Sequence, residues 1–120
     1  MVSKNVLIVE DELIIALMLE QMVTQMGYNV VDKVTTGELA IEKATMLQPD
    51  IILMDIRLQG EIDGVEAISE IQKMHDIPVI YITGNTDQQH QSRLKKTEYL
   101  DFLVKPITQN KLSHSLDLAS

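Results

Sequence analysis

Cysteine and tryptophan are absent from this 120-residue sequence, and phenylalanine occurs once, as Phe102. Without cysteine the chain can form no disulfide framework, thiolate nucleophile or cysteine zinc site, and nothing in it indicates an oxidising compartment. Long apolar runs are missing too. The first run after Met1, Val6 to Val9, is too short for the apolar segment of a signal peptide or for a membrane span. We therefore expect a cytoplasmic protein with no membrane association.

Positive charge is also scarce, with 10 basic against 18 acidic residues and a formal net charge of −8. This charge repels nucleic acid and anionic lipid, so direct binding to either is not expected, and cations or basic partners are favoured. The charged fraction of 23% and the hydrophobic fraction of 45% are ordinary for a soluble globular protein. The length suits one domain over residues 1–120, and no linker, repeat or low-complexity stretch divides the chain.

Short apolar runs at four places predict strands that are buried on both faces. They are Val6–Val9, Ile51–Met54, Val79–Ile82 and Phe102–Val104. A fifth candidate, Tyr28–Val34, mixes valines with polar residues, as a half-exposed edge strand does. Segments long enough for helices separate the strands, at about 12–26, 36–47, 64–74, 86–96 and 108–118. The alternation predicts an α/β fold with a doubly wound, five-stranded parallel sheet and helices on both faces.

Two of the predicted helices carry apolar residues at helical spacing. In the first, these residues are Ile15, Met18, Leu19, Met22 and Met26, and Gly27 follows as a C-cap. In the second they are Leu39, Ile41, Ala44 and Leu47, and Pro49 prevents the helix from continuing. We expect these residues to face the sheet.

Polar residues stand at the carboxyl ends of four predicted strands. Glu10 and Asp11 follow the first strand, Asp55 the third, Thr83 the fourth and Lys105 the fifth. In open parallel sheets ligands bind beyond these ends, where the strand order reverses. With the order 2-1-3-4-5, that point lies between the first and third strands, and the three acids meet there.

Three carboxylates in a partly desolvated crevice must take up protons or hold a cation. An all-oxygen site without histidine or cysteine suits Mg²⁺, which often shares its ligands with a phosphate. Lys105 and Thr83 offer a positive charge and a hydroxyl to further phosphoryl oxygens, which leaves Asp55 as the nucleophile.

Each of these residues also has an ordinary structural explanation. Asp55 can cap the turn after its strand, and Glu10 and Asp11 can cap the first helix and complement its dipole. Lys105 can be a solvated residue before a loop, Thr83 a helix cap and Phe102 plain core. The three histidines share no spacing, so we assign them no role. The order of the polar positions along the chain favours function.

The whole chain resembles the receiver domains of two-component response regulators. The resemblance rests on the pair Glu10-Asp11, Asp55 after Ile-Ile-Leu-Met, the Asp63-Gly64 turn, Thr83 after Val-Ile-Tyr-Ile, and Lys105-Pro106. It implies a flavodoxin-like sheet of order 2-1-3-4-5 and a domain that is not a conventional enzyme but promotes its own phosphotransfer and autodephosphorylation. A sensor histidine kinase or a histidine phosphotransfer protein would donate the phosphoryl group to Asp55, and a downstream protein target would respond.

The resemblance also implies roles for individual residues. Mg²⁺ would be bound by Glu10 through water, by Asp11, by Asp55 and by the backbone carbonyl of Arg57. Lys105-Pro106 would be a cis peptide. Thr83 and Phe102 would form the conformational switch, acting on a face made of the fourth helix, fifth strand and fifth helix. Arg57 and Asn85 would tune the lifetime of the phosphoryl group.

The chain departs from the commonest receivers in one loop. The interval from Asp55 to Gly64 is one residue longer, and Gln59 stands where many receivers have proline. The loop from Arg57 to Ile62 is therefore expected to take its own shape.

The stretch from Leu13 to Leu19 is apolar nearly all round. It predicts either an unusually buried helix or a docking surface for a kinase helix bundle or a second copy, so a homodimer stays open. Replacing Ile14 and Leu17 with Asp separates the two, because unfolding supports burial whereas weaker partner binding with an intact fold supports docking.

Three other functions are compatible with parts of this pattern. A phosphohydrolase of the haloacid dehalogenase type also uses an Asp at a strand end, but it needs a second Asp where this chain has Arg57. A flavodoxin-like cofactor binder needs a glycine-rich loop after the first strand, where Glu10 and Asp11 stand instead. A receiver-like scaffold that is never phosphorylated is disfavoured by the presence of Asp11, Asp55 and Lys105.

Overall fold

The computed structural model describes residues 4–84 and 92–119. Five parallel strands form one sheet in the order β2-β1-β3-β4-β5. The strands are β1 (Asn5–Val9), β2 (Asn29–Val34), β3 (Ile51–Asp55), β4 (Val79–Thr83) and β5 (Asp101–Val104). This is the α/β, doubly wound, flavodoxin-like sheet expected from the sequence.

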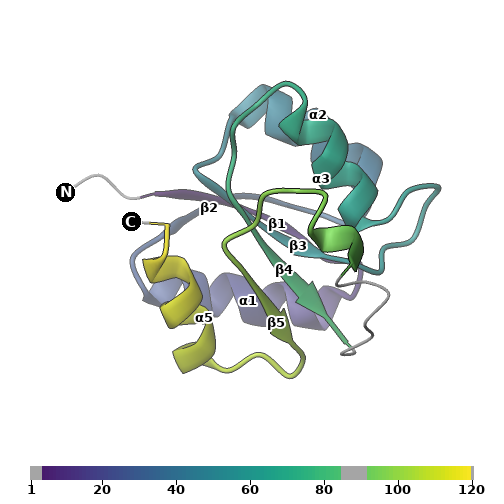
Figure 1. Cartoon of the computed structure of the whole chain (residues 1–120). Coiled ribbons are helices and arrows are strands. Elements are labelled where there is room, and N and C mark those ends of the chain that lie inside the picture. Colours follow the sequence, from purple (N-terminus) through teal and green to yellow (C-terminus); the bar gives the residue numbers. More distant parts are fainter. Residues whose placement is uncertain (1–3, 85–91, 120) are drawn as a thin grey trace.

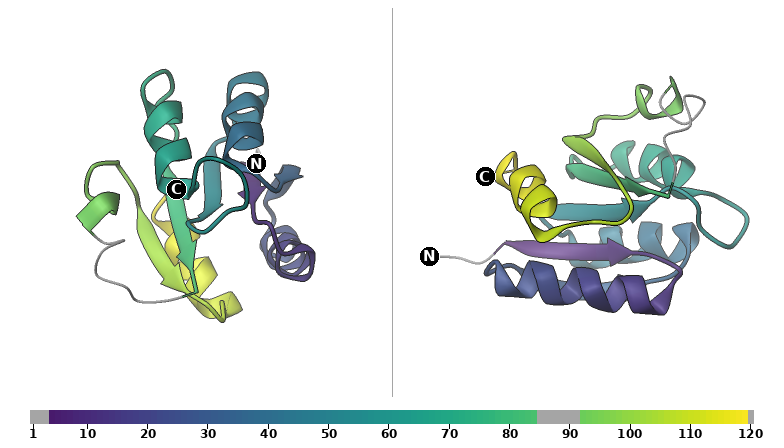
Figure 2. Two further views of the ribbon diagram at one scale, coloured as in Figure 1. Left: turned by 90° about the vertical axis from the view of Figure 1, so that its right-hand side faces the viewer. Right: turned by 90° about the horizontal axis from the view of Figure 1, so that it is seen from below.

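Helices cover both faces of the sheet, as Figures 1 and 2 show. They are α1 (Leu13–Gln25), α2 (Gly37–Leu47), α3 (Gly64–Gln72) and α5 (Gln109–Asp117). Helices α1 and α5 lie on one side, and α2 and α3 lie on the other. Residues 92–94 are helical, and the rest of the helix predicted at 86–96 falls largely outside the described residues.

The apolar strands divide the core between the two faces because successive side chains of a strand point in opposite directions. In β1, Leu7 and Val9 join the cluster under α2 and α3, whereas Val6 and Ile8 join the cluster under α1 and α5. All residues of β3 and β4 are buried. The edge strand β2 is half-exposed, as predicted. Burying one large aliphatic side chain contributes roughly 1.5–3 kcal/mol of stability. The buried strands β1, β3 and β4 therefore contribute most to the stability of the sheet.

The two long helices face the sheet with smaller residues than the sequence suggested. Ala16, Leu19 and Val23 are the buried residues of α1, and Met18 is 48% exposed. In α2 the buried residues are Gly37, Ala40 and Ala44, while Leu39 and Leu47 are 39% and 38% exposed. The prediction that Met18, Leu39 and Leu47 face the sheet is therefore wrong. Small side chains let each helix lie close to the sheet, which leaves the larger neighbours at the rim.

Local signals fix where the helices begin and end. Thr36 Oγ1 accepts a hydrogen bond from Leu39 N at the start of α2. Asp63 and Glu66 form a reciprocal capping box at the start of α3. Gly27 follows α1 with φ +92°, a conformation that glycine adopts readily, so its predicted place at the helix end is confirmed.

Candidate functional site

The acidic residues converge at the carboxyl ends of the two central strands. Glu10 follows β1, and Asp55 ends β3, the strand that pairs with β1 through Val9 and Met54. One carboxylate oxygen from each of Glu10, Asp11 and Asp55 lies within 4.8 Å of the others. Glu10 and Asp55 are buried, and Asp11 is partly exposed. The prediction that the three acids meet at this edge of the sheet is confirmed.

Lys105 faces the two buried acids from the end of β5. Its Nζ lies 3.0 Å from Glu10 Oε1 and 3.3 Å from Asp55 Oδ2, and its side chain is only 19% exposed. The backbone N–H of Lys105 donates to Thr83 O at 2.8 Å, which ties the ends of β4 and β5 together. The Lys105-Pro106 peptide is cis, as the resemblance implied. A freely solvated lysine before a loop, the ordinary explanation, does not describe this side chain.

The two oxygens of Glu10 have different surroundings. Oε2 accepts a hydrogen bond from Glu12 N at 3.0 Å. Oε1 is buried and has no hydrogen-bond partner among the described residues. Its contact with Lys105 is thus an ion pair without hydrogen-bond alignment. Glu12, and neither Glu10 nor Asp11, is the N-cap residue of α1, and Glu10 accepts from the backbone N–H of this N-cap residue.

Asp55 is held from two sides. Its Oδ1 accepts from Arg57 N at 3.2 Å, and its Oδ2 accepts from Lys105 Nζ at 3.3 Å. The first contact is the turn-capping bond that the ordinary explanation predicts for a strand-end aspartate. The second turns the same carboxylate toward the crevice, so the capping role and a chemical role are compatible.

Burial shifts the protonation of these acids. It raises the pKa of Glu10 from 4.5 to about 7, with the nearby charge of Asp55 adding to the rise. Burial also raises the pKa of Asp55, against the lowering effects of Glu10 and Lys105. Burial by itself lowers the pKa of Lys105, but the contacts with Glu10 and Asp55 outweigh it and leave that pKa raised. Two carboxyl groups therefore share one ammonium, and Glu10 retains a proton almost to neutral pH.

The residues at this site fit a hard divalent cation. All three side chains offer carboxylate oxygens, and Glu10 Oε1 is a buried oxygen without a hydrogen bond in the part of the chain that the structure describes. Mg²⁺ prefers oxygen ligands and keeps several waters, so it needs few protein groups. A cation placed among these carboxylates would displace the proton on Glu10 and relieve the repulsion between the acids.

The other predicted site residues lie around this cluster. Thr83 is buried at the end of β4. Phe102 is half-buried in β5, opposite Tyr81 in the strand register, and packs against the core cluster under α2 and α3. Arg57, two residues after Asp55, is exposed. Asn85 lies outside the described residues.

Some contacts near the site were not predicted from the sequence. Asp63, which caps α3, also pairs with Arg93 at 2.7 Å. The spacing of Asp63 and Glu66 is that of a capping box, so this cap could have been found. A bridge between Thr36 and Gln59 ties the loop after β3 to the start of α2, and no local signal marks it.

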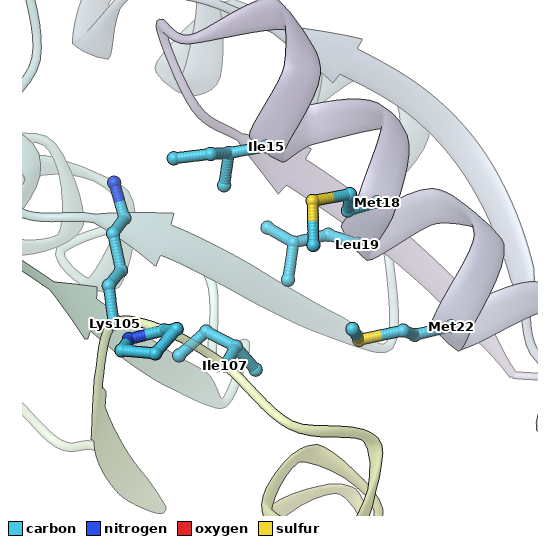
Figure 3. Close-up of a pocket in the computed structure, with 7 residues that line it drawn as sticks. Ile15, Met18, Leu19, Met22, Lys105 and Ile107 are labelled. Atoms are coloured by element: carbon cyan, nitrogen blue, oxygen red, sulfur yellow. The ribbon is translucent and has the colours of Figure 1, made fainter.

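An apolar groove of about 360 Å³ adjoins the crevice, lined by Ile15, Met18, Leu19, Met22, Lys105, Pro106 and Ile107. Figure 3 shows it between α1 and the segment that follows β5, with the Lys105 side chain along one end. Next to it on α1, Leu13 and Ile14 are 69% and 75% exposed. The alternative that α1 is an unusually buried helix is therefore wrong.

Comparison with known proteins assigns the chain to a family. The sequence model of the response regulator receiver domain family matches residues 6–117. The chain belongs to this family. It is 35% identical to the chemotaxis protein CheY of Thermotoga maritima over 98% of both chains. It is 31% identical to the transcriptional regulatory protein PdtaR of Mycobacterium tuberculosis, covering 98% of this chain and 57% of that protein.

Solved structures agree with the assignment as a receiver domain. The signal receiver domain of a modulated diguanylate cyclase from Desulfovibrio desulfuricans has a TM-score of 0.92 and 35% identity, covering 98% of this chain and 94% of that one. The CheY of Borrelia burgdorferi, solved with CheX, BeF3 and Mg²⁺, has a TM-score of 0.88 and 28% identity, covering 94% and 86% of the two chains.

The chain is thus a receiver domain of the response regulator family, and receiver domains are generally not conventional enzymes. Receiver domains interact with histidine kinases and downstream effectors, and they typically bind Mg²⁺ at an acidic pocket of the kind seen here. Across residues 4–84 and 92–119, every helix is too short or too polar to cross a membrane.

Proposed function

We propose that residues 1–120 act as a single receiver domain that accepts a phosphoryl group on Asp55 in the presence of Mg²⁺. The observation that carries this proposal is the convergence of Glu10, Asp11 and Asp55 oxygens within 4.8 Å of one another, with Lys105 Nζ against two of them. An acidic cluster alone is common on protein surfaces. A buried acidic cluster faced by one lysine at the strand ends of this fold is suited to phosphoryl chemistry.

The ligands proposed for Mg²⁺ are Asp11, Asp55, the backbone carbonyl of Arg57, and Glu10 through water. When bound, the metal supplies positive charge to the phosphoryl oxygens as they transfer. The solved CheY of Borrelia burgdorferi, whose complex contains BeF3 and Mg²⁺, supports this assignment.

Each residue around Asp55 has a defined part in the transfer. One carboxylate oxygen of Asp55 forms a bond to phosphorus while the bond from phosphorus to the donor's histidine nitrogen breaks, and that nitrogen keeps the electron pair. Lys105 stays protonated and holds one phosphoryl oxygen by charge, and the Thr83 hydroxyl donates to another. The hydrogen bond from Arg57 N keeps Asp55 oriented during the approach.

The response to phosphorylation is assigned to Thr83 and Phe102. Thr83 moves toward the phosphoryl group, and the half-buried ring of Phe102 turns into the space that it leaves. The output surface is the one formed by the fourth helix, β5 and α5. Arg57 and Asn85 tune how long the phosphoryl group survives, and the receiver promotes its own dephosphorylation.

The partners proposed are a sensor histidine kinase or a histidine phosphotransfer protein, together with a downstream protein target. The groove beside α1 ends at Lys105, so a helical donor seated there has its histidine near Asp55. The exposure of Ile14 and Leu17 on the same helix supports docking, by a kinase bundle or by a second copy that forms a homodimer. No direct contact with nucleic acid or membrane is proposed, and the location proposed is the cytoplasm.

The test is the intact mass of the protein after treatment with acetyl phosphate or phosphoramidate, with and without Mg²⁺. Wild type is expected to gain one phosphoryl group only with Mg²⁺, and Asp55→Asn is expected to gain none because an amide cannot form the acyl phosphate. Equal phosphorylation of the Asp55→Asn variant, or of wild type without metal, would remove Asp55 or the metal from the proposal.

A further inference from the structure

The loop between β3 and α3 is tied to the start of α2 by three separate contacts. Thr36 and Gln59 form an isolated parallel bridge. Glu38, in the first turn of α2, accepts a hydrogen bond through Oε1 from Ile62 N at 3.2 Å. Its other oxygen, Oε2, lies over Gly60, where an added Cβ would stand 2.9 Å away. The Glu38 carboxylate therefore spans the tip of this loop.

The sequence of the loop suits this contact. Gly60 has φ +109°, a conformation that other residues rarely adopt, and its missing side chain leaves room for the carboxylate. Ile62 packs against the core cluster under α2 and α3. At the start of the helix, Gly37 leaves room for that isoleucine, because a Cβ there would lie 2.7 Å from Ile62 Cγ1.

The same loop carries the backbone next to Asp55. At its base, Gly64 N donates to Ile56 O at 2.8 Å, and Arg57 N donates to Asp55 Oδ1 at 3.2 Å. The bridge at Gln59 is only two residues beyond Arg57. Arg57 therefore lies between a loop base tied by hydrogen bonds and a loop tip held by α2.

We propose that Glu38 is a positioning residue for the metal site, which acts by clamping the loop tip so that the Arg57 carbonyl faces the acidic cluster. This inference rests on the proposed function of that cluster. Its basis is the hydrogen bond from Ile62 N to Glu38, the close approach of Glu38 Oε2 to Gly60, and the bridge from Thr36 to Gln59, two residues beyond Arg57. A negative charge at the first turn of a helix is also favoured by the helix dipole, so the clamp is compatible with the stability of α2.

The test is Mg²⁺ binding followed by NMR of backbone amides, with thermal melting of each variant in parallel. Glu38→Ala removes the acceptor and is expected to weaken Mg²⁺ binding on the order of tenfold, the size seen when residues that orient metal ligands are lost. Glu38→Gln keeps an acceptor oxygen and is expected to stay within about twofold of wild type. Glu42→Ala removes an exposed acid one turn further along α2 and serves as the matched control for charge, with no change expected.

The outcomes separate the clamp from the proposed function. If wild type binds no Mg²⁺ near Asp55, the proposed function fails. If wild type binds and Glu38→Ala binds equally well, or Glu38→Gln and Glu42→Ala weaken binding as much as Glu38→Ala does, the clamp is overturned. Hydrogen exchange of the Ile62 amide in wild type gives a test without any variant. The clamp predicts slower exchange than at the neighbouring Glu61 amide, and equal exchange would contradict it.

Discussion

The two ends of the sheet differ in the burial and hydrogen bonding of their polar groups. At the amino ends of the strands, polar side chains are exposed and well paired: Asn5 N donates to Asp50 Oδ2 at 2.7 Å. Gln72 exchanges two hydrogen bonds with the backbone of Glu98, at 2.7 and 3.0 Å. At the carboxyl ends, Glu10 and Asp55 are buried and both contact the Lys105 ammonium, and Glu10 Oε1 has no hydrogen bond to any residue within 4–84 and 92–119.

We infer from this difference that polar groups at the amino ends serve stability, whereas those at the carboxyl ends serve function. Hydrogen bonds at the amino ends pair backbone N–H and C=O groups with side chains and add modestly to stability. Crowded acids at the carboxyl ends weaken the metal-free protein, because buried like charges repel and lose their hydration. The carboxyl ends are therefore arranged for a ligand rather than for stability.

The largest expected effect on stability comes from removing Lys105. Lys105→Met leaves Glu10 and Asp55 without a cation and is expected to destabilise the metal-free protein by about 2–4 kcal/mol at pH 8. The loss is expected to be smaller at pH 5, where Glu10 is protonated, and Mg²⁺ is expected to restore part of it. Urea unfolding at both pH values, with and without Mg²⁺, measures these terms. A variant as stable as wild type at pH 8 would show that the carboxyl ends are not crowded.

A smaller effect is expected from pH. Because the pKa of Glu10 is raised from 4.5 to about 7 by burial, the folded chain binds more protons than the unfolded chain between these values. Unfolding free energy is therefore expected to fall as pH rises through this window, by on the order of 1–3 kcal/mol.

The control for this pH dependence is Glu10→Gln, which cannot titrate at this position. The difference between wild type and the variant isolates the contribution of Glu10 from that of all groups the two proteins share. Parallel stability curves for the two proteins between pH 4.5 and 7 would rule out the shift.

The smallest effect is expected at the opposite end of the sheet. Gln72→Ala removes two exposed hydrogen bonds and is expected to cost up to about 1 kcal/mol. Phosphorylation by acetyl phosphate and Mg²⁺ binding are expected to be unchanged, because Gln72 lies at the far end of the strands. Loss of phosphorylation or of Mg²⁺ binding in this variant would contradict the view that the two ends of the sheet have separate roles.

The positions of the strand ends could be predicted from sequence because buried parallel strands are unbroken apolar runs, and the polar residues that follow them then meet at one edge. The facing side of α1 could not be predicted. Its first turns are apolar nearly all round, so periodicity does not distinguish Met18, which is exposed, from Leu19, which is buried. The contact of Glu38 with Ile62 also has no local signal, because it joins the first turn of α2 to a loop residue 24 positions further along the chain.

The most direct test of the account is calorimetric titration of Mg²⁺ into the protein at pH 6, repeated in two buffers of different ionisation enthalpy. The account predicts one ion per chain and release of a proton on binding, because the metal displaces the proton that burial keeps on Glu10. Both signals should be lost in Asp11→Asn or Asp55→Asn. Absence of binding to wild type, or binding that persists unchanged in these variants, would contradict the account.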